Sequence, residues 1–324
     1  MIKGLAAKFP YKHPRVIKGI GDDTAVTVER GGKVLLSTTD ILIEGTHFKR
    51  GYMDAYLLGR KALSISLSDI AAMGGVPLFF LTSIALPPDT ERGFFEDIYR
   101  GVSDVAREHG ALLIGGNTAR SGKVMVSTTV LGEAIRGEVV YRSGARAGDD
   151  IYVTGATGVS ALGLRILKRC GLGALKKKGR SGKAALKHLD PTPRVEAGRA
   201  LATGRLATAM MDISDGLALD LKRMCGESKA GAVIEIGRLP VADELKGFPA
   251  RRGKVMDLIV SGGEDYELLF TAPERHARRI AALSRRLSLP MTPIGKIAKK
   301  RAGIRFVHDD GTELEIKKPG FEHF

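Results

Sequence analysis

The sequence predicts an α/β protein with two domains. In both halves of the chain, short apolar runs typical of strands alternate with longer segments whose apolar residues recur at helical spacing. The length of 324 residues exceeds what one hydrophobic core usually fills. A polar turn at residues 144–150 separates the halves. We therefore expect one domain over residues 1–143 and a second over residues 144–324.

The first half is expected to follow the order β-β-α-β-α-β-β. A short strand comes after the acidic pair Asp22-Asp23, and a second strand begins at residues 34–36. Residues 53–73 show the apolar spacing of a helix that ends before Gly74-Gly75. The remaining elements predicted here are a strand at 78–86, a helix that opens at Asp89 as its N-cap, an apolar run at 111–114 and a strand at 124–130.

The second half begins again with a strand and continues with alternating elements. The basic stretch at residues 171–187 is poor in apolar residues, so we expect it to be an exposed excursion. The other predictions are strands at 151–154, 233–236 and 258–260, helices at 160–170, 194–209, 217–224 and from 274 onward, and a hairpin that turns at 309–311.

Composition narrows the classes of partner. The 51 Lys and Arg residues exceed the 36 Asp and Glu residues, and the net charge of +15 favours anionic partners such as nucleotides or phosphorylated metabolites. Only 6% of residues are aromatic and none is tryptophan, which argues against a nucleic-acid surface that stacks on bases.

Localisation is expected to be cytoplasmic and away from membranes. The two cysteines, Cys170 and Cys225, are too few and too far apart for a disulfide framework or a zinc site, which suits a reducing compartment. No signal segment opens the chain. The longest uncharged run, residues 70–88, is interrupted by Gly74-Gly75-Val76-Pro77, so we expect no membrane span.

A row of oxygen-bearing side chains follows the strand at residues 34–36. The segment Ser37-Thr38-Thr39-Asp40 places three hydroxyls beside a carboxylate, and His47 comes seven residues after Asp40. Hydroxyl and carboxylate oxygens are ligands for hard cations such as Mg²⁺, whereas zinc prefers thiolate and imidazole. From this segment alone, a metal site and a polar turn are both open interpretations.

Other short acidic segments recur beside glycine or hydroxyl residues, while the standard nucleotide-binding motifs are missing. The chain contains neither Gly-x-x-x-x-Gly-Lys-Ser/Thr nor Gly-x-Gly-x-x-Gly. Two carboxylates about 4 Å apart repel each other by about 4 kcal/mol at an effective dielectric constant of 20, so converging acidic residues would need cations. The acidic segments are Asp22-Asp23, Asp40, Asp69 at a helix C-terminus, Asp212 with Asp215, and Glu264 with Asp265.

Taken together and in order, these segments resemble the thiamine-monophosphate kinase family, which belongs to the aminoimidazole ribonucleotide synthetase-like superfamily. The resemblance runs from residue 21 to residue 324. The segments that carry it are Gly21-Asp22-Asp23-Thr24-Ala25-Val26, Ser37-Thr38-Thr39-Asp40 with His47-Phe48, Leu67-Ser68-Asp69-Ile70-Ala71-Ala72-Met73-Gly74-Gly75, Gly115-Gly116-Asn117-Thr118, Asp212-Ile213-Ser214-Asp215-Gly216-Leu217, Gly263-Glu264-Asp265-Tyr266-Glu267-Leu268 and Gly320-Phe321-Glu322-His323-Phe324.

The resemblance implies phosphorylation of thiamine monophosphate by ATP, assisted by several Mg²⁺ ions. It also implies an N-terminal domain whose mixed sheet forms a homodimer, and a C-terminal α/β domain that completes the active site. The acceptor is a phosphate and already anionic, so we expect direct in-line transfer without a catalytic nucleophile. The implied metal ligands are Asp23, Thr38, Thr39, Asp40, Asp69, Asn117, Asp212 and Asp215. The implied ATP contacts are Tyr99, Gly116, Asn117, Arg142 and Ser214, and the implied thiamine contacts are His47, Glu264 and Phe321.

Asn117 departs from the pattern, because the family usually has Gly-Gly-Asp-Thr where this chain has Gly115-Gly116-Asn117-Thr118. A neutral amide contributes less charge to a metal site than a carboxylate does. Two alternatives therefore stay open at this point. One is a diverged nucleotide-binding paralogue without catalysis, and the other is a ligase that acts on a different phosphorylated metabolite.

Overall fold

The computed structural model describes residues 13–177, 179–246, 248 and 252–321. The chain forms two compact units. Unit 1 contains the chain up to Ala71, Gly75–Gly137 and Gly163–Val195, and unit 2 contains Ala72–Gly74, Glu138–Leu162 and the chain from Glu196 onward. Each unit is thus assembled from separate stretches of the chain, and a single boundary between residues 143 and 144 stays a sequence prediction.

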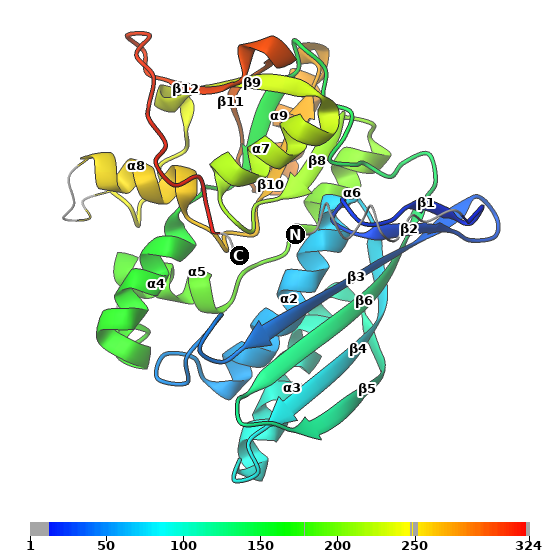
Figure 1. The fold of residues 1–324 in the computed structure, drawn as a ribbon, viewed down its shortest axis with the longest axis vertical. Helices are drawn as coiled ribbons and strands as arrows, with labels where there is room; N and C mark the ends of the chain where they lie inside the picture. The colour runs from blue at the N-terminus through cyan, green and yellow to red at the C-terminus, as the bar shows by residue number, and fades with distance from the viewer. Residues whose placement is uncertain (1–12, 178, 247, 249–251, 322–324) are drawn as a thin grey trace. The chain divides into compact units, whose positions relative to one another are not determined.

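Unit 1 contains a six-stranded mixed sheet in the order β1-β2-β3-β6-β4-β5 (Figure 1). β4 and β5 are parallel, and the other neighbours are antiparallel. The strands are β1 (Val16–Lys18), β2 (Ala25–Val28), β3 (Lys33–Ile43), β4 (Val76–Leu86), β5 (Leu112–Arg120) and β6 (Met125–Ile135). Along β3, β4 and β6, buried residues alternate with more exposed ones, as expected for strands with one covered face.

Two helices lie on the same face of this sheet, α2 (Ala55–Ala72) and α3 (Arg92–His109) (Figure 1). They approach each other closely at two glycines. A Cβ atom on Gly59 would lie 2.0 Å from the carbonyl oxygen of Ile98, and one on Gly101 would lie 2.0 Å from that of Tyr56. The N-cap position of α3 is occupied by Glu91, whose side chain makes no capping hydrogen bond, rather than by the predicted Asp89. The helix ends at His109, followed by the C-cap Gly110 in the left-handed conformation.

Unit 2 contains a second six-stranded sheet, in the order β12-β9-β11-β7-β10-β8. Its strands are β7 (Asp150–Thr154), β8 (Ala209–Asp212), β9 (Ala230–Glu235), β10 (Leu268–Ala272), β11 (Met291–Lys299) and β12 (Ile304–Val307). The α-helices of the second half are α4 (Val159–Cys170), α5 (Arg180–Leu189), α6 (Val195–Thr203), α7 (Leu217–Ser228), α8 (Arg252–Ser261) and α9 (Ala277–Arg286). Short 3₁₀ turns are η1 (Gly171–Ala174), η2 (Ile236–Arg238), η3 (Glu274–His276) and η4 (Lys300–Ala302).

Several predicted elements of the second half were wrong. Residues 258–260 lie in helix α8, because a three-residue apolar run looks the same in a buried helix as in a strand. The strand at Leu268–Ala272 was missed, although all five of its residues are buried. The helix predicted over 194–209 ends at Thr203, and Ala209 already belongs to β8.

The basic stretch at residues 171–187 is not a structureless excursion. It forms η1 and most of α5, and it buries Ala174, Ala184 and Ala185 completely. Gly163 of α4 lies so close that a Cβ atom there would be 2.0 Å from the carbonyl oxygen of Ala184. The prediction failed because the buried face of this segment is built largely from alanine and glycine, which give a weak hydropathy signal.

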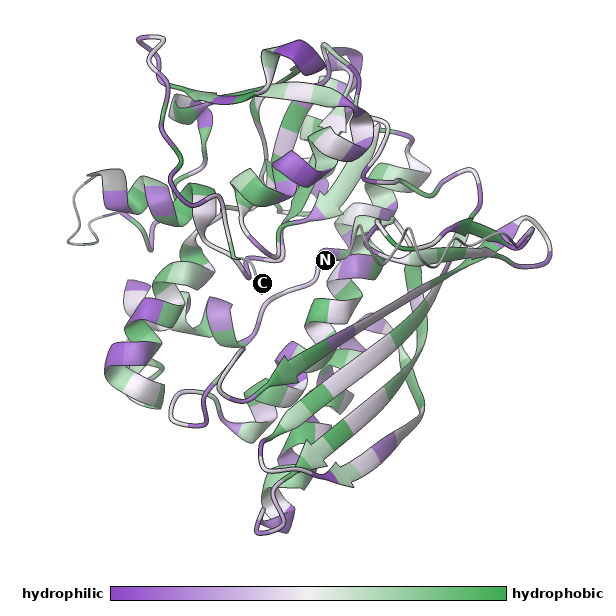
Figure 2. Ribbon diagram, viewed as in Figure 1, coloured by the Kyte–Doolittle hydropathy of each residue, from purple (hydrophilic) through white to green (hydrophobic). Residues whose placement is uncertain are grey.

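The predicted hairpin at residues 309–311 is confirmed by an antiparallel bridge between Val307 and Glu313. Within the part of the chain that the structure describes, none of the helices has the length and apolar character needed to cross a membrane. Hydropathy is distributed accordingly, with hydrophobic and hydrophilic residues mixed along the helices and strands (Figure 2).

Candidate active site

In unit 1, strand β3 and helix α2 bring two of the predicted acidic ligands to one face of the sheet. Thr38 and Asp40 are two residues apart on β3, so their side chains point to the same face. Asp69 lies in the last turn of α2, and its carboxylate accepts a hydrogen bond from the Thr38 hydroxyl. The structure thus groups Thr38, Asp40 and Asp69 beneath the C-terminal part of α2.

Asp40 has a hydroxyl partner that the sequence motifs did not single out. Ser66, one helical turn before Asp69 on α2, donates a hydrogen bond from Oγ to Asp40 Oδ2 at 2.9 Å. Burial raises the pKa of the Asp40 carboxyl above its usual value, and the hydrogen bond from Ser66 opposes this effect. Each acidic residue of this pair, Asp40 and Asp69, therefore has its own hydroxyl donor.

Asp23 belongs to the same acidic group. Its side chain is buried, and a carboxylate oxygen of Asp23 lies within 4.8 Å of one of Asp69. Asp23 lies just before β2, and β2 is paired with β3, so the sheet brings Asp23 close to the acidic residues of β3 and α2. Closely spaced carboxylates with hydroxyl neighbours form an all-oxygen donor set, and this chemistry fits Mg²⁺ better than a softer metal.

Strand pairing extends a polar row from Asp40 across the sheet. Asp40 pairs with Thr128 on β6, Thr128 pairs with Thr82 on β4, and Thr82 pairs with Gly116 on β5. Directly paired residues share a face, so Gly116 lies on the same face as Asp40. A Cβ atom on Gly116 would lie 2.0 Å from the Thr82 carbonyl oxygen of the neighbouring strand β4, so this position of β5 requires glycine.

Two predicted ligands lie on the other face of this sheet. Thr39 alternates away from Thr38 and Asp40, and its hydroxyl bonds to the Thr128 carbonyl at 3.2 Å and to the Thr129 hydroxyl at 3.0 Å. Asn117 alternates away from Gly116, is exposed on β5, and accepts the Thr118 N–H at 2.9 Å through Oδ1. The structure does not bring these two side chains to Asp40, and their ligand roles stay predictions.

His47 and Tyr99 are held by local contacts within unit 1. The Nδ1 atom of His47 accepts the backbone N–H of Ile43 at 3.0 Å, which places the proton of the neutral ring on Nε2. Tyr99 packs against Phe95 on α3 with their ring centroids 4.9 Å apart, and burial raises its pKa. Their proposed contacts with thiamine and ATP are not tested by these observations.

In unit 2, the loop after β8 is organised by two residues of α7. Asp220 is fully buried, and its Oδ2 accepts the backbone N–H groups of Asp215 at 3.0 Å and Gly216 at 3.1 Å. Nη1 of Arg223 lies 2.7 Å from Asp220 Oδ1 and 2.6 Å from Asp215 Oδ2. Burial raises the pKa of Asp220 to about 7, although Arg223 opposes the shift.

The same loop meets the predicted thiamine contacts. The N–H of Glu264 donates to the Ser214 carbonyl at 2.7 Å, and the N–H of Phe321 donates to the Asp215 carbonyl at 3.0 Å. Gly320 lies beside Asp215, where a Cβ atom would be 2.4 Å from the Asp215 carbonyl oxygen. Ser214, Asp215, Glu264 and Phe321 are therefore brought together, as the motifs suggested. Residues 322–324 lie outside the described residues.

The loop at residues 262–267 carries backbone strain and buried carboxylates. Glu264 and Tyr266 have positive φ angles of 65° and 51°, which L-residues other than glycine adopt at a cost. Between them, buried Asp265 accepts the N–H groups of Gly158 at 2.6 Å and Ser160 at 3.0 Å, at the start of α4. Glu267 accepts the Thr154 hydroxyl at 2.7 Å.

Arg142 and Asp212 complete the predicted set in unit 2. Arg142 lies close enough to lower the pKa of Asp220, and its carbonyl accepts the Ser228 hydroxyl at 3.1 Å. Asp212 is buried at the end of β8, where it pairs with Leu268 of β10. Arg142 thus adds positive charge near Asp220 and Arg223.

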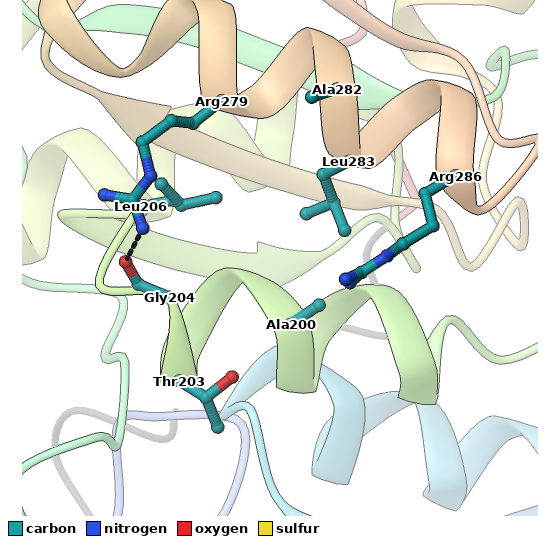
Figure 3. A pocket seen from close by; sticks show the side chains of 8 residues that line it. All are labelled: Ala200, Thr203, Gly204, Leu206, Arg279, Ala282, Leu283 and Arg286. Carbon is teal, nitrogen blue, oxygen red and sulfur yellow. Dashed lines mark hydrogen bonds between the residues drawn. The ribbon is translucent and has the colours of Figure 1, made fainter.

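A separate groove in unit 2 lies between α6 and α9 and contains none of the predicted site residues. It has a volume of about 470 Å³, and Leu206 and Leu283 form part of its lining. Figure 3 shows Arg279 and Arg286 extending from α9 toward α6, with Arg279 donating to the Gly204 carbonyl at 3.0 Å. The acidic residues predicted from sequence therefore lie outside this groove.

Four residues outside the predicted ligand and substrate contacts support that set, and three of them, Ser66, Asp220 and Arg223, were not predicted from the sequence. Ser66, Asp220 and Arg223 each contact a predicted site residue or its backbone, whereas Asp265 is the sequence neighbour of Glu264 and contacts the start of α4. Ser66 could have been found from helical spacing, since it lies three residues before Asp69 on α2. Asp265 stands within a quoted motif, but its role as the cap of a distant helix has no local signal.

Comparison with known proteins assigns the chain to a family. Residues 21–134 match the N-terminal domain of the AIR synthase related proteins, and residues 146–308 match their C-terminal domain. The thiamine-monophosphate kinase of Aquifex aeolicus (strain VF5) is 38% identical over 312 residues, which are 95% of this chain and 93% of the relative. The Bacillus subtilis (strain 168) enzyme is 33% identical over 96% of this chain and 95% of its own length.

Solved structures agree with these relatives. The structure of AaThiL complexed with AMPPCP and TMP superimposes with a TM-score of 0.84 and 34% identity over 100% of this chain and 96% of that one. The thiamine-monophosphate kinase of Stenotrophomonas maltophilia K279a gives a TM-score of 0.80 and 34% identity over 97% and 96% of the two chains. The chain therefore belongs to the AIR synthase related proteins and, among them, to the thiamine-monophosphate kinase family.

Proposed function

We propose that the protein transfers the γ-phosphoryl group of ATP to the phosphate of thiamine monophosphate, which yields thiamine diphosphate. One observation carries this proposal. The whole chain matches a structure complexed with AMPPCP, an analogue of ATP, and TMP, with a TM-score of 0.84 over 100% of its length. Full coverage matters because the proposed metal ligands and substrate contacts extend from Asp23 to Phe321.

Several Mg²⁺ ions are proposed to assist this transfer. The ligands would be Asp23, Thr38, Asp40 and Asp69 in unit 1 and Asp212 and Asp215 in unit 2, with Thr39 and Asn117 as further candidates. The all-oxygen donors of Asp23, Asp40 and Asp69 support this choice of metal. When bound, the ions neutralise charge on the phosphates.

The residues proposed to contact ATP are Tyr99, Gly116, Asn117, Arg142 and Ser214. His47, Glu264 and Phe321 would contact the thiamine moiety. Support comes from the contacts that gather Ser214, Glu264 and Phe321 around one loop, and from the glycine that brings β5 close to β4.

The chemistry that the protein must supply is positioning and charge neutralisation. The acceptor phosphate is anionic near neutral pH, so its oxygen attacks without a strong general base. Arg142 and the backbone N–H groups would bind phosphate oxygens, and no covalent phosphoenzyme is required. His47 is accordingly a substrate contact rather than a nucleophile.

We also infer a homodimer formed through the sheet of unit 1. All nine residues of the edge strand β5 are exposed, and Leu112, Leu113 and Ile114 are 62%, 46% and 55% exposed. α2 and α3 cover one face of the sheet, while Ile41 and Phe79 are exposed on other strands (Figures 1 and 2). Three exposed apolar residues in a row on an edge strand favour pairing with another chain, which supports the proposed homodimer.

A cytoplasmic location is part of the proposal. Cys170 and Cys225 are both free thiols in the structure, which fits a reducing compartment.

The proposal is tested by incubating the purified protein with ATP, Mg²⁺ and thiamine monophosphate and measuring thiamine diphosphate by chromatography. We expect product with the wild-type protein and its loss with Asp40→Asn. Asp97→Asn, which removes an exposed carboxylate paired with Arg100 on α3, is the matched control and should retain activity. If the wild-type protein makes no product at high Mg²⁺, the proposed reaction is wrong.

A further inference from the structure

Ser66 and Thr128 form a buried pair of hydroxyls behind Asp40. Ser66 is fully buried and Thr128 is 1% exposed, and their hydroxyl oxygens lie 2.7 Å apart. Ser66 Oγ is also 2.9 Å from Asp40 Oδ2, while Thr128 Oγ1 is 2.7 Å from the carbonyl oxygen of Ala62. The hydroxyls of Ser66 and Thr128 therefore form a chain of close contacts from the Asp40 carboxylate to the backbone of α2.

The two hydroxyls have three close partners but only two protons to donate. Each hydroxyl has one proton to donate. If Ser66 donates to Thr128 and Thr128 to Ala62, Asp40 receives nothing. If Thr128 donates to Ser66 and Ser66 to Asp40, the carboxylate is satisfied. A third arrangement, with Ser66 donating to Asp40 and Thr128 to Ala62, leaves two hydroxyl oxygens 2.7 Å apart with no proton between them, which is unfavourable. The Ala62 carbonyl still has a partner in the second arrangement. Ala62 and Ser66 both lie inside α2, where the backbone N–H of Ser66 donates to the Ala62 carbonyl four residues earlier.

The second arrangement is the favoured one. Hydrogen bonds to an ionised acceptor are about twice as strong as those between neutral groups, and a buried carboxylate without a donor is costly. Both protons should therefore be directed toward Asp40. This arrangement fixes which way the Asp40 carboxylate faces, since Oδ2 is tied to α2 and Oδ1 is left for another partner.

We propose that Ser66 is a positioning residue for cation binding at Asp40, and that Thr128 acts through Ser66. The inference rests on the proposed role of Asp40 as a Mg²⁺ ligand. Groups that hydrogen-bond to a metal ligand typically alter metal affinity by about 10- to 100-fold when they are removed. Ser66 is fully buried and its hydroxyl donates to Asp40, so its effect should appear in cation binding through Asp40.

The test measures binding of Mn²⁺, used as a paramagnetic substitute for Mg²⁺, by electron paramagnetic resonance in the presence of AMPPCP. We expect Ser66→Ala to weaken Mn²⁺ binding by about 10- to 100-fold. Thr128→Val should weaken it less, because Ser66 can still donate to Asp40. Ser66→Thr restores a hydroxyl at the same position and should recover part of the affinity.

The matched control is Ser64→Ala, another serine of α2 that is 1% exposed. It changes the same atoms in the same helix without touching Asp40. Circular dichroism of all four variants confirms that each is folded. If Ser66→Ala and Ser64→Ala bind Mn²⁺ alike, or if Thr128→Val has the larger effect, the proposed role of Ser66 is wrong.

Kinetics separate this inference from the proposed reaction. Ser66→Ala should raise the Mg²⁺ concentration needed for half-maximal rate while kcat at saturating Mg²⁺ changes little. A wild-type protein that forms no thiamine diphosphate overturns the proposed reaction. A wild-type protein that does, with an unchanged Mg²⁺ requirement in Ser66→Ala, overturns only the role of Ser66.

Discussion

Replacing Asp265 by asparagine should destabilise the protein substantially, because this carboxylate caps helix α4 from a distant loop. Its two oxygens accept the N–H groups of Gly158 and Ser160 at 2.6 Å and 3.0 Å, and the residue is fully buried. Asparagine keeps one acceptor oxygen and places an NH₂ group against the other N–H. One hydrogen bond to a charged group is lost, at about 1.5–3 kcal/mol, together with about 0.3–1 kcal/mol of helix-dipole stabilisation.

The expected loss in the free energy of unfolding is therefore about 2–4 kcal/mol, a large share of the stability of an ordinary domain. Urea denaturation followed by far-ultraviolet circular dichroism measures it, and the absence of tryptophan makes this probe preferable to fluorescence. Asp310→Asn is the matched control. Oδ1 of Asp310 also accepts two hydrogen bonds, from the N–H and hydroxyl of Thr312, but the residue is exposed.

Asparagine at position 310 keeps the single oxygen that accepts both bonds, so this control measures the loss of one negative charge without the loss of a buried capping hydrogen bond. Asp310→Asn should change the urea midpoint far less than Asp265→Asn. If the two variants unfold at the same urea concentration, the contacts of Asp265 with the start of α4 do not stabilise the fold, and the reasoning is refuted.

Three further predictions concern metal, pH and thiol chemistry. Asn117→Asp should lower the Mg²⁺ concentration needed for activity, measured by Mg²⁺ titration of the rate; an unchanged or higher requirement counts against a ligand role. Because the pKa of Asp220 is raised from 3.8 to about 7 in the folded state, the folded protein binds more protons between these values, and the free energy of unfolding falls as pH rises through that range. Asp220→Asn should show a smaller fall in urea titrations from pH 4 to 7, and an equal fall would contradict the assignment. Exposed Cys170 should react with a thiol reagent at pH 8, whereas Cys225, whose pKa burial raises to about 11, should react only after denaturation; two fast thiols in the folded protein would disprove this.

Sequence alone predicted the alternation of strands and helices because most elements have a clear hydropathy period. The prediction of these elements failed where every residue of a short segment is apolar, and where alanine and glycine form the buried face of a helix. Leu258, Ile259 and Val260 look like a strand in isolation and form part of α8. The alanines of α5 are buried although the surrounding stretch is strongly basic.

In the candidate site, too, some features could be predicted from the sequence and others depend on the folded structure. Asp40 and Asp69 could be grouped by resemblance, and the structure confirms that they lie on one face of the unit 1 sheet. The contacts of Ser66 and Thr128 with Asp40 and with each other could not be predicted, because a buried hydroxyl has no distinctive spacing in the sequence. Contacts between residues far apart in the chain, such as Asp265 with Gly158, depend on the completed fold and leave no pattern in the local sequence.

The left-handed conformations of Glu264 and Tyr266 limit how far the protein can be stabilised by engineering. Each such residue costs about 1–3 kcal/mol relative to a relaxed backbone, so glycine at position 264 would relieve strain and make the fold more stable. The same change would remove the carboxylate proposed to contact thiamine. At position 264, thermal stability therefore favours glycine, whereas the proposed thiamine contact requires glutamate. A selection for more stable variants that does not also test activity should replace Glu264.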